Sequence, residues 1–71
     1  MRYLAVLGFN TKQLWVYDEI VDVYIDPPAE LLNDLDKLGF DEAEERLTQI
    51  ANADPTPEWL FDKEFWYDGE I

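Results

Sequence analysis

The excess of carboxylates constrains this chain more than any other feature. Seventeen of the 71 residues are Asp or Glu and five are Lys or Arg, so any fold carries a net charge of −12. Self-repulsion of that size destabilises a compact state. The chain is nevertheless 48% hydrophobic and 15% aromatic, whereas disordered acidic tails are poor in aromatic and branched residues. We therefore expect a folded domain with its acids on the solvent side of every element.

The length allows a single domain over residues 1–71. A domain of this size buries only about 60% of the surface that its unfolded chain exposes. The absence of Cys and His leaves no disulfide or ordinary zinc site to reinforce it. There is no run of about 18 apolar residues that would predict a membrane span, and residues 1–9 are too short for a secretory signal. We expect a cytoplasmic protein.

The first 25 residues predict β-structure. Residues 2–9 have apolar side chains at both odd- and even-numbered positions, which predicts an interior strand covered on both faces. Residues 13–25 are rich in Val, Ile, Trp and Tyr, and the parity of their apolar residues changes at Asp18-Glu19. That change predicts either a bulge in one long bent strand or a turn between two short strands. We favour the bent strand, because Asp-Glu is poor chemistry for a two-residue hairpin turn.

Two helices are predicted between residues 26 and 51. Asp26 is the expected N-cap of the first helix, Pro27 its first residue and Gly39 the glycine that ends it. Asp41 and Glu44 match a capping box that opens the second helix. The residues expected to face inward at helical spacing are Leu31, Leu32, Leu35, Leu38, Ala43, Leu47, Ile50 and Ala51.

The last part of the chain combines a short helical turn with aromatic residues. Thr56-Pro57-Glu58 has the composition of a helix start, and residues 65–67 are expected to form a third strand or a lid on the sheet. The predicted fold is an α+β domain in which a small antiparallel sheet packs against a helical hairpin. The order of its elements is β-β-α-α, followed by a short aromatic C-terminal segment.

The missing residue types exclude most catalytic chemistry. The chain has no Ser, Cys or His, and its three Thr have no imidazole base to activate them. A catalytic pair of carboxylates needs a cleft that isolates one acid, and a 71-residue domain has little volume for such a cleft. We expect no enzyme activity and no cofactor.

One spacing matches a calcium-binding loop. Asp34, Asp36, Gly39 and Glu45 fall at positions 1, 3, 6 and 12 of an EF-hand loop. Leu38, however, occupies position 5, where an oxygen ligand is required, and it continues the leucine stripe of the first helix. We therefore predict that this segment is helical and that the chain has no metal site.

The acids are the main candidates for a binding role. Duplex DNA carries about one charge per 1.7 Å of its axis, and carboxylates three or four positions apart on a helix lie roughly 5–6 Å apart. The residues expected to form such a row are Asp34, Asp41, Glu42 and Glu45 on the helices, continued by Asp18, Glu19 and Asp22 at the edge of the sheet. The row predicts a nucleic-acid mimic, an inhibitor that docks on a basic DNA- or RNA-binding surface.

This interpretation also predicts the class of partner. A polyanion is repelled by bare nucleic acid and by anionic membranes, so the expected partner is a protein with a basic surface. In charge and size, and in those two properties alone, the chain is similar to small phage or plasmid proteins that disarm host restriction or interference systems.

Aromatic side chains support an alternative. Trp and Tyr are enriched at the centres of interfaces, and this chain has too many for all of them to lie in so small a core. The candidate anchor near the C-terminus is the segment 61–68, in which Trp66 lies among the acids Asp62, Glu64 and Asp68, and Trp66 is also a candidate anchor for the mimic. The chain is then a small adaptor or subunit that binds through an aromatic face, with its acids serving solubility. A homodimer formed through the sheet is a related expectation.

Overall fold

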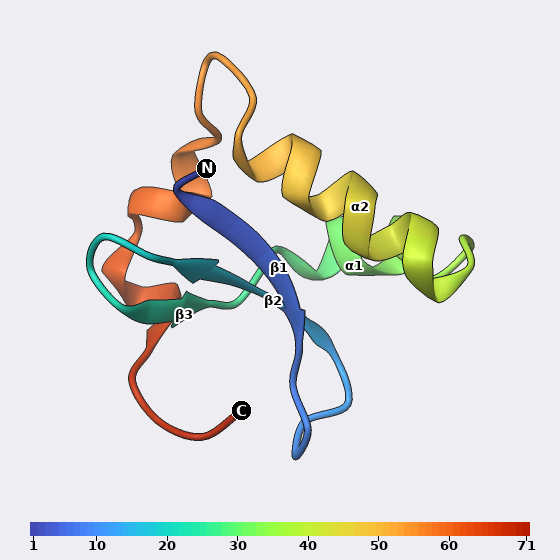
Figure 1. Ribbon diagram of the computed structural model, residues 1–71, viewed down its shortest axis with the longest axis horizontal. Helices are drawn as coiled ribbons and strands as arrows, with labels where there is room; N and C mark the ends of the chain where they lie inside the picture. Colours follow the sequence, from blue (N-terminus) through green and yellow to red (C-terminus); the bar gives the residue numbers. More distant parts are fainter.

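The computed structural model describes all 71 residues and places two helices on one face of a four-stranded antiparallel sheet (Figure 1). The strands are β1 (Tyr3–Leu7), β2 (Leu14–Asp18), β3 (Val23–Ile25) and β4 (Trp66–Tyr67). The helices are α1 (Ala29–Leu35) and α2 (Phe40–Ala51), and two short 3-10 helices, η1 (Glu58–Phe61) and η2 (Lys63–Phe65), precede β4. α2 packs against β1 and β2, and α1 packs against α2. The predicted α+β class, with a sheet packed against a helical hairpin, is confirmed.

Residues 13–25 form two strands joined by a turn, so the prediction of one bent strand is wrong. The connection spans residues 19–22. It is therefore longer than the two-residue turn for which the sequence Asp18-Glu19 is unsuitable. Asp18 builds this turn, because its Oδ1 accepts a hydrogen bond from the Ile20 N–H at 2.9 Å and its carbonyl accepts one from the Asp22 N–H at 2.8 Å. Asp22 has a φ of 57°, a left-handed conformation that Asp tolerates better than most residues.

β1 is an edge strand, because the strand order is β1-β2-β3-β4. The prediction of an interior strand covered on both faces is therefore wrong, and the side chains of its second face are only half-buried. α2 covers the free edge instead. Thr48 Oγ1 accepts a hydrogen bond from the Ala5 N–H at 3.0 Å. Asn52 accepts one from the Tyr3 N–H at 3.2 Å and donates one to the Tyr3 carbonyl at 2.8 Å. These side chains occupy backbone groups that would otherwise recruit another strand.

Both helices begin without side-chain caps. α1 starts two residues after the predicted Pro27, and Asp26 does not cap it. Gly39 is the N-cap of α2 with a φ of −63°, so its predicted role as the residue that ends the first helix is wrong. Asp41 lies in the first turn of α2 and not at its cap, so the predicted capping box with Glu44 does not form. Neither helix has the length and apolar content that crossing a membrane requires.

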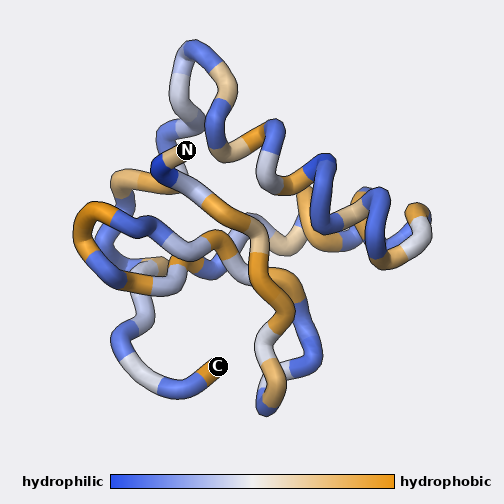
Figure 2. Tube along the Cα trace, viewed as in Figure 1, coloured by the Kyte–Doolittle hydropathy of each residue, from blue (hydrophilic) through white to orange (hydrophobic).

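The core lies between the helices and the side of the sheet that faces them. The register pairs Val16 with both Ala5 and Ile25, and Ile25 with Trp66, so these four side chains form one row across the four strands. Figure 2 shows hydrophilic and hydrophobic stretches alternating along α2. The predicted inward residues of both helices, except Ile50, lie in this core or pack against it. The buried cluster consists of Tyr3, Ala5, Leu14, Val16, Ile25, Leu35, Ala43, Leu47, Ala51 and Leu60.

The C-terminal segment completes the sheet. Of the two alternatives for residues 65–67, the strand is correct, and it is the fourth strand because β2 and β3 are separate. The chain then returns to the β1–β2 loop, where the Ile71 carbonyl oxygen accepts hydrogen bonds from the N–H groups of Asn10 and Thr11, both at 2.8 Å. Gly8 allows this approach, since a Cβ there would lie 2.8 Å from the same oxygen.

The edge contacts predict that Asn52→Ala destabilises the fold. The substitution removes hydrogen bonds to the Tyr3 N–H and carbonyl and to the Thr48 carbonyl, and it leaves the backbone polar groups of Tyr3, a buried residue, without these partners. We expect a loss of about 2 kcal/mol in the free energy of unfolding, measured by urea denaturation. Gln49→Ala on the exposed side of the same helix is the control, with an expected change within about 0.5 kcal/mol. Equal effects of the two substitutions would contradict the edge-covering role.

Candidate binding surfaces

Almost all of the negative charge lies on the surface. Of the seventeen carboxylates, only Asp18 is buried and only Asp26 and Glu44 are half-buried, so fourteen are exposed. The chain forms three ion pairs, and two of them are exposed contacts within a helix region, Lys37–Asp34 at 3.8 Å and Arg46–Glu42 at 3.9 Å. Exposed pairs of this kind contribute about 0–1 kcal/mol. Most of the surface carboxylates therefore have no basic partner within the chain.

Asp18 does not belong to the predicted row of surface acids. Its side chain is 1% exposed, and its two oxygens accept a bidentate pair of hydrogen bonds from Arg2, at 3.0 Å from Nε and 2.9 Å from Nη2. Burial by itself raises the pKa of this carboxyl group, but the hydrogen bonds from Arg2 and from the N–H groups of Ile20 and Val21 outweigh it and hold the pKa below the ordinary 3.8. Asp18 is a structural residue that fixes the β2–β3 turn.

The lowered pKa of Asp18 gives a pH-dependent prediction. A carboxyl group whose pKa is depressed in the folded state stabilises the fold above its unfolded pKa, and this contribution is lost as the pH falls through the folded pKa. We expect Asp18→Asn to lower the free energy of unfolding by about 2 kcal/mol at neutral pH. The difference between wild type and variant should shrink as the pH falls below 3.8. Urea denaturation at several pH values measures it, and a difference that stays constant with pH would contradict the charged interaction.

The helical acids of the predicted row lie on the solvent side of the helices. Asp41, Glu42 and Glu45 project from the first half of α2, and all three are exposed. Asp41 and Glu45 also line an open hollow between α2 and β1, together with Glu44 and Met1. The structure thus brings these acids together along one helix.

The sheet acids of the predicted row lie elsewhere. Glu19 and Asp22 belong to the β2–β3 turn, and Figure 1 shows this turn and the first turn of α2 at opposite sides of the molecule. Asp34 belongs to α1, where it pairs with Lys37. The continuous row predicted from the sequence is therefore divided into a helix surface and a turn surface.

The predicted aromatic anchor at the C-terminus is part of the core side of the sheet. Trp66 packs against the buried cluster, and its Nε1 donates a hydrogen bond to the Leu60 carbonyl at 3.0 Å. Asp62 caps η2 by accepting a hydrogen bond from the Glu64 N–H at 3.1 Å. Asp62, Glu64 and Asp68 are exposed. Because the indole is already anchored within the chain, Trp66 does not suit insertion into a partner.

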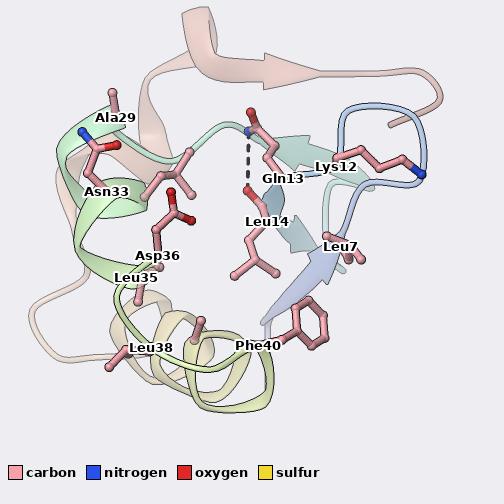
Figure 3. A pocket seen from close by; sticks show the side chains of 12 residues that line it. Leu7, Lys12, Gln13, Leu14, Ala29, Asn33, Leu35, Asp36, Leu38 and Phe40 are labelled. Carbon is pink, nitrogen blue, oxygen red and sulfur yellow. Dashed lines mark hydrogen bonds between the residues drawn. The ribbon is translucent and has the colours of Figure 1, made fainter.

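A hollow of about 490 Å³ lies between the β1–β2 hairpin, α1 and the start of α2 (Figure 3). Its walls are mainly apolar, and its charged side chains are Lys12 and Asp36. A single carboxylate does not provide the pair of acids that glycoside hydrolysis uses. No three acidic side chains converge in a way that could hold a metal ion. Of the residues of the calcium-loop spacing, Asp34 lies in α1 and Glu45 in α2, whereas Asp36 and Gly39 lie in the connection between the two helices. The segment is thus helical as far as Leu35, where α1 ends, and again from Phe40, where α2 begins.

The face of the sheet that points away from the helices carries a row of tyrosines. The register pairs Leu4 with Tyr17, Tyr17 with Tyr24, and Tyr24 with Tyr67, so one side chain from each strand lies in line across the sheet. The first three are half-buried and Tyr67 is 46% exposed. We call these four residues the tyrosine row. Sequence reasoning identified the tyrosines as surplus aromatics but missed the row, because their alignment depends on the position of the β2–β3 turn.

Two contacts order this face. The rings of Tyr17 and Tyr24 have centroids 5.3 Å apart at an interplanar angle of 44°, within the range of favourable aromatic pairs. The Tyr17 hydroxyl donates a hydrogen bond to Asp22 Oδ1 at 2.6 Å. This hydrogen bond to a charged acceptor is the main cause that raises the pKa of Tyr17 to about 12.

The Tyr17–Asp22 contact predicts a titration difference. The raised pKa means that this contact stabilises the fold fully below pH 10.0, the ordinary pKa of tyrosine, and that its contribution is lost as the pH rises through about 12. We expect Asp22→Asn to lower the pKa of Tyr17 toward 10.0, as followed by the ultraviolet absorbance of tyrosinate. Burial also raises the pKa of Tyr3, so Tyr17→Phe is needed to assign the step. An unchanged high-pH titration in Asp22→Asn would contradict the contact.

Comparisons with known proteins give no match. A scan against protein-family models, a search of curated proteins and a search of solved structures each find no significant similarity to this chain. The charge distribution and the two surfaces described above are therefore the basis for proposing a function.

Proposed function

We propose that this protein is a non-catalytic inhibitor that mimics nucleic acid and docks on a basic DNA- or RNA-binding surface of another protein. The observation that carries the proposal is the set of fourteen exposed carboxylates on a scaffold with only two exposed ion pairs. Unpaired charge of one sign costs stability in a small domain. Binding of a basic partner offsets that cost. The opposite charges of the two proteins also steer them together, which makes their association fast.

The solvent side of α2 is the proposed docking surface. Asp41 and Glu45 are four positions apart on one helical face, which places their carboxylates roughly 5–6 Å apart. Glu42 adds a third negative charge within the same two turns, and its contact with Arg46 is long and exposed. The first half of α2 thus presents a short line of negative charges on a rigid support, as a nucleic-acid strand presents its phosphates.

The proposal extends to the setting of the protein. An inhibitor of a nucleic-acid-processing enzyme acts where such enzymes work, so we place it in the cytoplasm. A small acidic protein of this type suits a phage or mobile element that has to disarm a host defence enzyme, and we propose that class of origin.

A second candidate function is favoured by the tyrosine row. Partly exposed aromatic side chains aligned across a sheet are suited to a protein interface, because Tyr supplies a large contact area and few rotatable bonds. In this alternative the protein is an adaptor or subunit that binds its partner through the sheet, and the acids serve solubility. Binding of that kind persists at moderate salt, whereas docking by carboxylates does not.

The test is capture of partners from a host lysate on the immobilised protein, with identification by mass spectrometry. We expect capture of a nucleic-acid-binding protein that is displaced by moderate salt and by added duplex DNA. The variant Asp41→Asn, Glu42→Gln, Glu45→Gln should bind that partner about tenfold more weakly. The control variant Glu30→Gln, Asp54→Asn, Glu58→Gln removes the same charge from exposed positions elsewhere and should bind more tightly than the α2 variant. A partner that resists salt, DNA and the α2 substitutions would overturn mimicry and favour the adaptor.

A further inference from the structure

The tyrosine row borders a hollow on the open face of the sheet. This hollow has a volume of about 600 Å³, and its walls include Tyr17, Tyr24, Val6 and Phe9. Glu70 is the single charged residue that lines it. Aromatic walls with one carboxylate form an environment that attracts an organic cation, since the faces of aromatic rings carry negative potential.

More negative charge surrounds this hollow. Asp22 lies at its tyrosine wall, where Oδ1 accepts the hydrogen bond from Tyr17 and Oδ2 has no partner within the chain. Glu19 is close enough to Tyr17 to contribute to the rise of its pKa. Neither these two acids nor Glu70 forms an ion pair. The Nζ of Lys12 lies 4.5 Å from the centroid of the Phe9 ring, which is part of the wall of the hollow.

We infer that the hollow beside the tyrosine row binds an arginine side chain presented by a basic segment of the protein partner. The inference rests on the proposed function in one respect, that the partner is basic. A planar guanidinium stacks on tyrosine rings and donates paired hydrogen bonds to a carboxylate, whereas an ammonium does neither. Tyr17 and Tyr24 supply the rings, and Asp22 Oδ2 and the carboxylate of Glu70 supply the acceptors.

Two other occupants fit this face less well. A second copy of the chain carries the same net charge of −12, and a symmetric contact would bring equivalent rims of carboxylates together. Single-stranded nucleic acid stacks its bases on aromatic platforms of this kind, but its phosphates would meet Glu19, Asp22 and Glu70. Charge complementarity therefore favours the basic polypeptide over both.

The test uses two short peptides of equal charge, one of alternating Arg and Gly and the other of alternating Lys and Gly. We expect the Arg peptide to bind the wild-type protein several times more tightly in a calorimetric titration, and to shift the amide NMR signals of Tyr17 and Tyr24. The variant Tyr17→Leu, Tyr24→Leu should weaken binding of the Arg peptide about tenfold and abolish the preference over Lys. Phe61→Leu, at an exposed aromatic residue of η1, is the control and should leave the preference unchanged.

The inference is overturned if the two peptides bind equally, or if the tyrosine variant, shown by circular dichroism to be folded, keeps the preference. The inference is also overturned if the tyrosine substitutions leave peptide binding unchanged but abolish one of two other interactions. These are self-association, measured by sedimentation, and binding of a labelled single-stranded oligonucleotide. The α2 variant described above separates this inference from the proposed function. If the wild-type protein shows no preference for the Arg peptide but still captures a partner that DNA displaces, only the inference is wrong. If it prefers the Arg peptide but captures no partner that DNA displaces, only mimicry is wrong.

Discussion

The buried carboxylate of Asp18 is the interaction on which the rest of the sheet depends. It joins Arg2 at the start of β1 to the turn that reverses the chain after β2. That turn fixes the register of β2 with β3, because Asp18 is itself paired with Val23 across it. A slip of one residue would exchange the two faces of a strand. The same contact therefore decides that Val16 and Ile25 enter the core and that Tyr17 and Tyr24 face the opposite side.

The helices supply the other half of the structure, and they act through polar groups as well as apolar ones. The inner side of α2 buries Leu47 against the sheet, and its last turns carry Thr48 and Asn52 to the edge of β1. Edge strands are sites of unwanted strand pairing. In a domain with little surface to bury, one helix both fills the core and closes this edge, and no helix covers the face that bears the tyrosine row.

Periodicity in the sequence was sufficient to predict the helical stripes, the α+β class and the acidic exterior, because each depends on local spacing and on the cost of burying charge. Several of the points at which it failed depend on contacts distant in sequence. Asp18 is indistinguishable from the other acids until Arg2, sixteen positions away, is placed beside it. β1 is an edge strand because β4, from the far end of the chain, pairs with β3 and leaves β1 paired with β2 alone. The predicted row of acids mixed residues from opposite sides of the molecule for the same reason.

The two surfaces differ in what they imply about binding. The acids of α2 act at a distance, and their effect on a partner is screened by salt. Under the inference drawn above, the tyrosine row acts only on contact and distinguishes one cation from another, because ring stacking depends on the shape of the cation. A small inhibitor needs both properties, since charge alone attracts every basic protein in the cell. In the proposed complex, specificity depends on an arrangement that the fold creates, in which carboxylates without internal ion pairs surround aromatic rings held in line by the register of the sheet.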